Sequence, residues 1–305
     1  MSETFQIYNS IAEFYAATGG HLEQAVDFTI HRLEELHPNT PYKSPLFRVN
    51  YYTIVLVGSG TGCYILDSHT FPTKLHTLYF TNPGHIKGFE MHEPVTGYII
   101  TFAESFLKQH VCENMLDDFP FLIAEVVSPQ YLTDPIFQVF ENLFLQIIQE
   151  YDSQSIYKFK IIGNLMMVLL LKIKDFFWTD YNPLTEADSD TQIVRTFKYN
   201  LEAHYRALVT GMEDVLYQVQ DYAAMQHLHP NYFSTVIKRK TGKTVNTWIT
   251  EKTIAEAQAL LARSSQSIQQ IADTLGFKDA SHFSRFFKKQ TGTSPSIFRQ
   301  QVEHS

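Results

Sequence analysis

The stretch 267–299, SIQQIADTLGFKDASHFSRFFKKQTGTSPSIFR, carries the most regular hydrophobic pattern of the chain. Two runs within it place apolar residues three and four positions apart, which is the spacing of an amphipathic helix. The basic residues of the second run, Arg285, Lys288 and Lys289, are left on its other faces. The pattern predicts two short helices separated by a turn, the second with a basic face. The apolar positions are Ile268, Ile271, Ala272 and Leu275 in the first run and Phe283, Phe286 and Phe287 in the second.

Residues that favour helix ends stand at the limits of these two runs. Ser267 followed by Gln270 has the spacing of a capping box. Gly276 stands where a helix C-terminus favours a left-handed residue, and Asp279 or Ser281 can cap the next helix. Two short helices, a tight turn and a basic second helix are typical of a helix-turn-helix, whose second helix fits the DNA major groove. The residues that close the second helix and open a third short one are Gly292, Ser294 and Pro295.

A related pattern occurs 50 residues earlier, where YFSTVIKRKTG at 232–242 aligns with HFSRFFKKQTG at 282–292. Phenylalanine, serine, lysine, threonine and glycine recur at matching positions of the two segments. The residues between them, 244–263, have the pattern of one continuous helix. We therefore expect two helix-turn-helix units, at about 219–242 and 267–292, joined by a helix. The alternative is a helical bundle without a role in nucleic-acid binding, which the repeated basic face disfavours.

The first third of the chain has a different pattern. After a helix-like segment at 7–17, β-branched and aromatic residues gather in short runs that turn residues separate, such as GSGTG at 58–62. Several short strands at regular spacing favour an antiparallel sandwich or barrel. The predicted strands are 48–57, 63–67, 77–84 and 96–102.

Helical spacing returns at 104–115 and continues in two longer segments, 136–151 and about 154–178. The last of these is apolar on most of its surface, so we expect it to be buried on more than one side. The β-sheet domain can cover one side and a partner subunit the other, although a helical hairpin within one chain is the alternative. Residues 179–190 are polar and acidic and read as a linker, after which 193–209 is a helix.

Composition and charge refine this division. The chain has 305 residues, a length typical of two domains, with 44% hydrophobic and 18% charged residues. The net charge of −8 alone disfavours a polyanionic partner. From Arg195 onward, however, 14 Lys and Arg face 9 Asp and Glu, a balance of +5 against −13 before it. Two cysteines, the absence of a signal-peptide pattern and the lack of a long apolar run lead us to expect a cytoplasmic protein.

The segment 193–301 resembles the AraC/XylS family of transcription regulators. Its second unit fits the family signature IA…GF.D.S.F.R.FK…G.SP..[YF]R almost throughout. The first unit departs from it, with His229 where a serine usually caps the recognition helix and Thr253 where the connecting helix usually has arginine. The resemblance implies an α+β protein: an N-terminal cupin-like antiparallel β-barrel with a helical pair, then an all-α domain of two helix-turn-helix units. The implied domains are 1–178 (sensor and dimerisation, helical pair about 134–178), a linker at 179–192 and 193–305 (DNA binding).

The resemblance also implies a set of DNA contacts. Arg285 can bond guanine bidentately, and Asn231 can read adenine. Basic residues at the ends of the two recognition helices suit phosphates, which position the protein without reading sequence. Two units on one chain imply two major-groove segments about one helical turn, ~34 Å, apart. The base contacts expected are Asn231, Ser234 and Thr235, then Ala280, Ser281, Ser284 and Arg285, and the phosphate contacts are Lys238, Arg239, Lys288 and Lys289.

The N-terminal region offers no pattern of an enzyme site. Its histidines are singly placed without a His-x-His pair, so we expect no metal and no other cofactor, and no catalytic residue stands out. We expect the barrel to hold an unknown small-molecule effector. The partners expected are double-stranded DNA, that effector, a second copy of the chain and RNA polymerase. The alternative is a cupin-type binding protein or enzyme with a vestigial helical tail. The candidate effector contacts are Tyr42, Arg48, Tyr52, Tyr64, His76, Tyr79 and Phe80.

Overall fold

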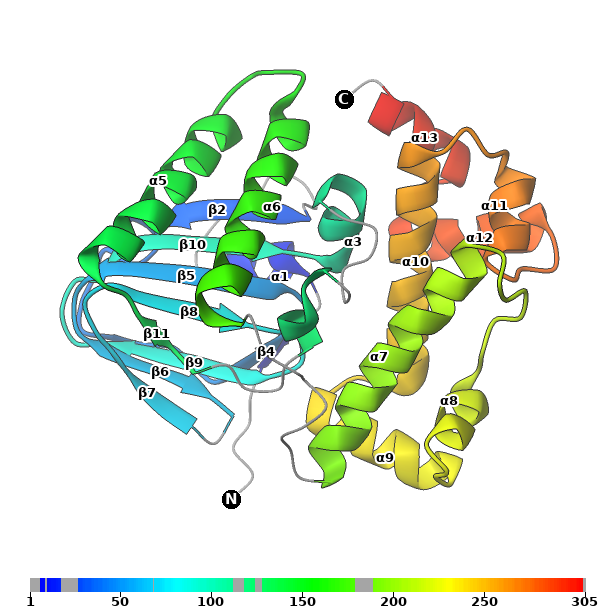
Figure 1. The fold of residues 1–305 in the computed structure, drawn as a ribbon, viewed down its shortest axis with the longest axis horizontal. Helices are drawn as coiled ribbons and strands as arrows, with labels where there is room; N and C mark the ends of the chain where they lie inside the picture. Colours follow the sequence, from blue (N-terminus) through cyan, green and yellow to red (C-terminus); the bar gives the residue numbers. More distant parts are fainter. Residues whose placement is uncertain are drawn as a thin grey trace. The chain divides into compact units, whose positions relative to one another are not determined.

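A computed structural model describes residues 6–8, 10–17, 27–67, 69–111, 118–123, 128–178 and 189–303. The chain divides into two units (Figure 1). One comprises Met1–Phe106 with Ala124–Tyr181, and the other comprises Leu107–Ile123 with Asn182–Ser305. The short segment 107–123 therefore belongs to the C-terminal unit although it follows the N-terminal strands in the chain. The domain boundaries expected from the sequence stay a prediction.

The N-terminal unit contains two mainly antiparallel sheets (Figure 1). In one sheet the strand order is β11-β8-β5-β10-β2, and in the other it is β1-β4-β9-β6-β7 with β3 also paired to β9. β1 pairs with β4 in parallel. The strands are β1 (Gln6–Tyr8), β2 (Phe28–Arg32), β3 (Tyr42–Lys43), β4 (Phe47–Val49), β5 (Tyr52–Ser59), β6 (Gly62–Leu66), β7 (His69–Thr73), β8 (Thr77–Thr81), β9 (Ile86–Met91), β10 (Thr96–Phe102) and β11 (Gln130–Tyr131).

Alternation along β5 assigns its two faces. Thr53, Val55 and Val57 line a cavity in this unit, so Tyr52 and the other even-numbered residues point to the opposite face. Two helices, α5 (Asp134–Tyr151) and α6 (Lys158–Phe177), lie over that sheet as an antiparallel pair (Figure 1). The ring of Phe144 on α5 lies 5.7 Å from that of Tyr98 on β10. The predicted sheet-rich region with a helical pair is confirmed.

Three details differ from the sequence prediction. The segment 7–17 contains a strand and then α1 (Ile11–Ala17), since Gln6–Tyr8 pairs with β4. The predicted strand 77–84 ends at Thr81, because Asn82 begins a turn that places Gly84 at φ 95°. Strands β2, β7 and β9 are not among the predicted ones. Their positions became clear only through pairing with distant strands.

The predicted helix 104–115 is replaced within the described residues by two different short elements. These are α3 (Glu104–Phe106) and a π-helix, η1 (Leu107–Val111). The wider π turn coincides with the point where Lys108 becomes buried in the C-terminal unit, and single π turns are frequent at such constrained sites. Residues 112–115 lie outside the described residues. A 3₁₀-helix, η2 (Pro120–Ile123), and α2 (Leu33–Leu36) complete the short helices.

The C-terminal unit is helical, as predicted (Figure 1). The long helix α10 contacts α7, α9, α11, α12, α13 and η1, and it therefore organises the unit. Its hydrophobic core includes Phe197, Tyr222, Phe233 and Phe283, all with fully buried side chains. The helices are α7 (Ser189–Val209), α8 (Val219–Met225), α9 (Pro230–Thr241), α10 (Val245–Arg263), α11 (Ile268–Thr274), α12 (Ala280–Thr291) and α13 (Pro295–Glu303).

Two further expectations can be placed on the structure. The linker expected at 179–192 falls mostly on residues 179–188, which lie outside the described residues. The helix expected at 193 begins earlier, at Ser189. Among the described residues, no helix has the length and apolar character needed to cross a bilayer.

Candidate nucleic-acid interface

Helices α9 and α12 are the second helices of the two predicted helix-turn-helix units, and each has 12 residues. Both end at a glycine in the left-handed region, Gly242 at φ 75° and Gly292 at φ 81°. The threonine before each glycine donates a hydrogen bond back to its own helix, from Thr241 to the carbonyl of Ile237 and from Thr291 to that of Phe287. The 50-residue repeat in the sequence is thus a repeat of structure.

The N-terminus of α9 is closed by a residue that departs from the family pattern. The Nδ1 atom of His229 accepts a hydrogen bond from the backbone N–H of Asn231 at 3.2 Å, and Pro230 occupies the first helical turn. The imidazole therefore supplies the cap that a serine hydroxyl usually supplies. In α12 the cap is Asp279, whose carboxylate accepts from the backbone N–H of His282 at 2.7 Å. Of the two caps expected there, Asp279 rather than Ser281 fills the position.

The turn of the second unit is built as the sequence predicts. Ser267 and Gln270 form the capping box of α11, with both reciprocal hydrogen bonds present. Gly276 follows at φ 72°, and a Cβ atom there would lie 3.0 Å from the backbone nitrogen of Leu216. Glycine therefore meets both a conformational and a spatial requirement at this position.

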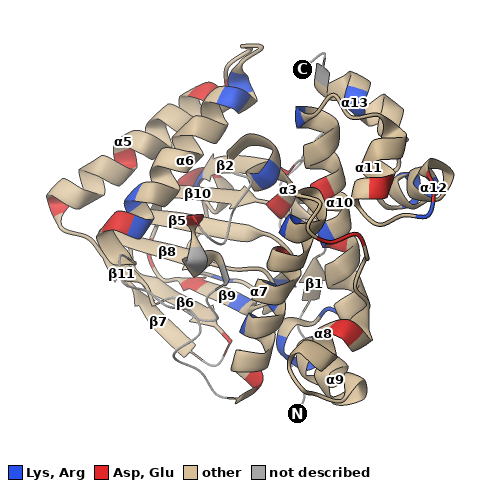
Figure 2. Ribbon diagram, turned by 45° about the vertical axis from the view of Figure 1, so that its right-hand side comes forward, with Lys and Arg blue, Asp and Glu red and all other residues tan. Residues whose placement is uncertain are grey.

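The predicted DNA-contacting residues of α9 and α12 are exposed or half-buried. Figure 2 colours the Lys and Arg positions along the ribbon. Because Phe233 on α9 and Phe283 and Phe287 on α12 are buried, these apolar residues and the predicted contacts occupy opposite faces of each helix. The exposed members are Asn231, Thr235, Lys238, Arg239, Ser281, Arg285, Lys288 and Lys289, and the half-buried ones are Ser234, Ala280 and Ser284. Their contact with DNA stays a prediction.

Two of the singled-out residues already have protein partners. Arg239 forms an ion pair with Asp190 of α7, whose carboxylate also accepts from the hydroxyl of Tyr232 at 3.4 Å. A phosphate contact from Arg239 would have to compete with this pair. Thr253 is fully buried in α10, where its hydroxyl bonds Tyr205 and the carbonyl of Ile249. The connecting helix therefore has a structural residue where the family usually has an arginine.

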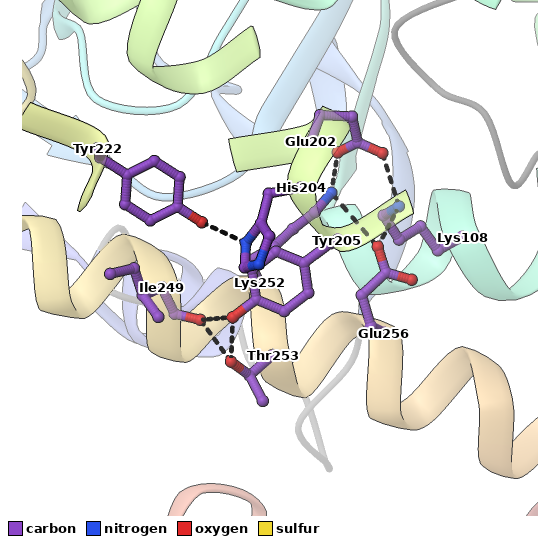
Figure 3. A network of polar contacts seen from close by, with 9 residues as sticks. All are labelled: Lys108, Glu202, His204, Tyr205, Tyr222, Ile249, Lys252, Thr253 and Glu256. Atoms are coloured by element: carbon purple, nitrogen blue, oxygen red, sulfur yellow. Dashed lines mark hydrogen bonds and ion pairs between the residues drawn. The ribbon is translucent and has the colours of Figure 1, made fainter. Parts of the chain in front are cut away.

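A buried ion network joins three segments of the C-terminal unit (Figure 3). Lys108 of η1 lies 2.9 Å from a carboxylate oxygen of Glu202 on α7 and 2.6 Å from one of Glu256 on α10. Lys252 on α10 pairs with the other oxygen of Glu202 and lies 3.6 Å from Glu256. Two ammonium groups thus face two carboxylates, which balances the charge and fixes η1 against α7 and α10.

A neutral polar cluster lies beside this network (Figure 3). The Nδ1 atom of His204 lies 2.7 Å from the hydroxyl of Tyr222, and its Nε2 atom lies 2.9 Å from the carbonyl oxygen of Val215. Only a protonated Nε2 can donate to a carbonyl, so Nδ1 accepts from Tyr222 and the ring is neutral. Burial lowers the pKa of His204 in agreement with this assignment. The cluster holds α7 to α8 and to the loop before it.

The N-terminal unit contains a cavity of about 200 Å³ between strands of its two sheets. Its wall is mostly apolar and aromatic, with Val55, Tyr64, Tyr79 and Phe89 among the lining residues. Two of the candidate effector contacts, Tyr64 and Tyr79, thus line it. Whether they bind a ligand stays a prediction.

The other candidate effector contacts lie elsewhere, mainly because strand alternation points them away. Tyr52 and Phe80 are on the opposite face of their sheet, where the rings of Tyr52 and Phe102 stack at 5.2 Å. His76 stacks on Phe137 at 4.0 Å and lies 3.1 Å from a carboxylate oxygen of Asp134. The remaining two candidates, Tyr42 and Arg48, do not line the cavity. Tyr42 stacks on His37, and Arg48 is buried in β4.

Two polar residues that line the cavity, Lys87 and Tyr51, were not predicted from the sequence. Lys87 occupies a strand position whose neighbours two residues on, Phe89 and Met91, also line the cavity. A period-two reading of IKGFEM would have shown a lysine on an apolar face, which is the signal that was available. Among the described residues, no group of three or more His, Cys, Asp or Glu is arranged to hold a metal ion.

Comparisons with known proteins agree on the C-terminal unit. Residues 222–301 match the family model described as a helix-turn-helix domain. The chain is 30% identical over 119 residues to the transcriptional regulator YobQ of Bacillus subtilis, covering 38% of this chain and 49% of YobQ. It is 28% identical over 164 residues to the arabinose operon regulatory protein of Escherichia coli, covering 54% of this chain and 52% of that one. The chain thus spans about half the length of each of these relatives.

Some similarities extend over more of the chain at lower identity. The regulator YfiF of B. subtilis is 21% identical over 297 residues, covering 92% of this chain and 90% of YfiF. Among solved structures, ToxT of Vibrio cholerae has a TM-score of 0.39 at 13% identity, covering 92% of this chain and 100% of ToxT. A solved structure similar to the C-terminal part alone is the DNA-binding domain of AdpA in complex with a target DNA. Its TM-score is 0.31 at 22% identity, covering 38% of this chain and 95% of that one. The sequence relatives are transcription regulators, and the matched domain is of the AraC type.

Proposed function

We propose that this chain, which carries an AraC-type helix-turn-helix domain, is a sequence-specific DNA-binding transcription regulator. One observation carries the proposal: two matching helices, α9 and α12, each place short polar side chains and a basic last turn on an exposed face. Exposed polar and basic side chains on a helix that is otherwise buried by phenylalanines suit insertion into a major groove. Cytoplasmic location and contact with RNA polymerase belong to the same proposal.

The two helices differ in what they offer to bases. Arg285 on α12 is a bidentate donor for guanine, whereas α9 offers the amide of Asn231 and the hydroxyl and methyl of Thr235. Lys238, Lys288 and Lys289 suit phosphates. The two halves of a binding site would therefore differ in sequence, with the more discriminating half under α12.

The test uses the full-length protein and a DNA sequence that it selects from a random pool. Arg285→Ala is expected to lower affinity for the selected site about 5- to 100-fold and to leave affinity for random DNA nearly unchanged. Lys288→Ala, the matched control on the same helix, is expected to weaken both DNAs equally and to lower the salt dependence of binding by about one ion. Equal losses on both DNAs for Arg285→Ala would contradict its base-reading role.

We further propose that an effector in the barrel cavity controls this activity and that the chain is a homodimer. The mostly apolar cavity supports the first part. Exposed apolar residues on α6 support the second, since such a row on one helix is typical of an interface. These residues are Phe159, Ile161, Val168, Leu171 and Phe176.

Sedimentation equilibrium tests the dimer. Val168→Glu combined with Leu171→Glu is expected to shift the protein to monomer, because two charges would be buried in the interface. Thr70→Glu, an exposed position on β7 in the sheet that does not contain β5, is the control and is expected to leave the assembly unchanged. A monomeric unmodified protein at micromolar concentration would rule out the proposed dimer.

The alternative function is a cupin-type small-molecule binding protein or enzyme in which the helical part has no DNA role. Residues 222–301 and the regulators among the relatives favour the regulator. Failure of the full-length protein to enrich any sequence from the random pool would favour the alternative.

A further inference from the structure

One lysine of the N-terminal unit, Lys87, is buried without a hydrogen-bond partner among the described residues. Lys87 lies in β9, its side chain is 2% exposed, and it lines the cavity. Among the described residues, no hydrogen-bond acceptor lies within reach of its Nζ atom. The ring of Tyr51 lies close by, with its centroid 6.0 Å from Nζ. Tyr51 lines the same cavity, and its hydroxyl is buried and has no hydrogen-bond partner in the described part of the chain.

The carboxylates of this region are engaged by other groups. Asp67 accepts from the Nδ1 of His85 at 2.6 Å and from the backbone N–H of Ile86 at 2.9 Å. Glu90 pairs with Lys43 at the edge of the same sheet. The other acidic residue of the cavity wall, Glu35, is exposed and lies 3.9 Å from Arg32.

Leaving an ammonium group buried in this way costs free energy. A buried amine without a counterion loses its hydration and gains nothing in exchange. Burial accordingly lowers the pKa of Lys87 to about 7, and the attraction of Asp67 only partly opposes this effect. The folded protein therefore holds a cation donor and a hydroxyl donor at an apolar cavity, which together suit one anionic group.

We propose that the barrel cavity binds a small monocarboxylate with an apolar body, whose carboxylate is held by Lys87 and Tyr51. The inference rests on the proposed effector function and specifies the class of effector. A single ammonium group balances a single negative charge, so a monocarboxylate fits better than a dianion. The apolar and aromatic wall suits a hydrocarbon body, because it offers such a body no polar competitor.

The size of the cavity limits the body of the ligand. A dry apolar cavity of about 150 Å³ accepts a benzene molecule. The volume here is about 200 Å³. The ligand would then have roughly six to nine carbon atoms. Octanoate and 3-phenylpropanoate are suitable probes, one linear and one with a ring.

Calorimetric titration of the full-length protein with these two probes tests the proposal. At least one of them is expected to bind, and octanamide and octylamine, which match octanoate in length, are expected to bind at least about tenfold more weakly. At pH 8, binding is expected to take up about one proton per ligand, seen as a dependence of the measured heat on the buffer, because the carboxylate restores the charge of Lys87.

Three variants make the test specific. Lys87→Met keeps an unbranched side chain, one atom shorter and without the ammonium group, and is expected to lose at least about tenfold in affinity together with the proton uptake. Tyr51→Phe is expected to lose affinity about threefold to tenfold while it retains the proton uptake. Lys160→Met, an exposed lysine on α6, is the control and is expected to change neither quantity.

The result that overturns the proposal is binding of neither carboxylate, or equal binding by the unmodified protein and Lys87→Met. Preferential binding of octanal, trapped on Lys87 by borohydride, would also overturn it in favour of a carbonyl ligand. DNA binding is measured separately without any probe, so loss of the carboxylate site and loss of the regulator function are distinguishable.

Discussion

Buried lysines occur in both units of the molecule, and the two units treat them in opposite ways. In the C-terminal unit, Lys108 and Lys252 are as buried as Lys87 but face two carboxylates, Glu202 and Glu256 (Figure 3). In the N-terminal unit, Lys87 lines a cavity, and the nearby carboxylates of Asp67 and Glu90 are paired with His85 and Lys43. The number of buried charges is therefore less informative than their pairing.

The comparison suggests a division of roles. A balanced buried network holds segments together, here η1, α7 and α10, because removing any one charge leaves another uncompensated. An unbalanced buried charge lowers the stability of the protein that carries it, and a ligand can return that stability. Four predictions test this difference, in order of decreasing effect.

The largest effect is expected when one carboxylate of the network is neutralised. Glu202→Gln leaves two buried lysines with the carboxylate of Glu256 alone, so the free energy of unfolding of the C-terminal unit is expected to fall by about 3–5 kcal/mol. Urea unfolding followed by the fluorescence of Trp248, in a Trp178→Phe background, measures it. A loss below about 1 kcal/mol would show that the network does not hold η1 against α7 and α10.

The opposite sign is expected for the unpaired lysine. Lys87→Met is expected to raise the free energy of unfolding of the N-terminal unit by about 1–3 kcal/mol at pH 6, because it removes a buried unpaired charge. Unfolding followed by Trp178 fluorescence, in a Trp248→Phe background, measures it. A destabilised variant would mean that Lys87 has a structural partner.

The pH dependence of this gain follows from the shifted pKa. The folded protein releases the Lys87 proton at about pH 7, whereas the unfolded chain holds it to about pH 10. Between these values the unfolded state binds more protons, so the stability of the unmodified unit rises with pH. The advantage of Lys87→Met should therefore be largest below pH 7 and should shrink toward pH 10.

A balanced deletion separates charge imbalance from lost contacts in the network. Lys108→Met combined with Glu256→Leu removes one cation and one anion and leaves Lys252 paired with Glu202. The expected loss is about 1–2 kcal/mol, clearly less than for Glu202→Gln alone, because no buried charge is left uncompensated. Urea unfolding in the same tryptophan background measures it. A loss as large as that of Glu202→Gln would attribute the stability to the contacts themselves.

The smallest effects are expected from two buried tyrosine hydroxyls. Tyr205 donates to the carbonyl of Ile249 at 3.1 Å, so Tyr205→Phe is expected to cost about 1 kcal/mol. Tyr51 has no hydrogen-bond partner within the described residues, so Tyr51→Phe is expected to be neutral or slightly stabilising. Thermal unfolding measures the stability of both variants. Equal losses of stability would contradict the proposed difference between the two units.

Much of the C-terminal unit was predictable because its signals are local. The capping box of Ser267 and Gln270, the left-handed Gly276 and the 50-residue repeat each depend on residues a few positions apart. Exposure of Arg285 followed from the burial of Phe283 and Phe287 on the same helix. The sequence did not show that His229 would replace a serine cap, since that depends on where the ring lies against the backbone N–H of Asn231 in the folded chain.

The barrel was less predictable, because β-pairing depends on distant residues. A candidate such as Tyr52 looks equivalent to Tyr64 until the register decides which face each occupies. The sequence predicted a regular helix at 104–115 and did not indicate the π turn at 107–111, for a related reason. Lys108 pairs with Glu202, 94 residues further along the chain, and no local pattern indicates that contact.

The sequence by itself determined the limits of the helices in the second helix-turn-helix unit, the repeat, the basic face of α9 and of α12, and the presence of short strands. These properties follow from the spacing of side chains along a single element. Tertiary structure alone decided which buried charges are balanced, because that depends on elements brought together from distant parts of the chain. Lys108 and Lys87 are both buried lysines. Only in the folded protein does Lys108 face two carboxylates while Lys87 lines a cavity.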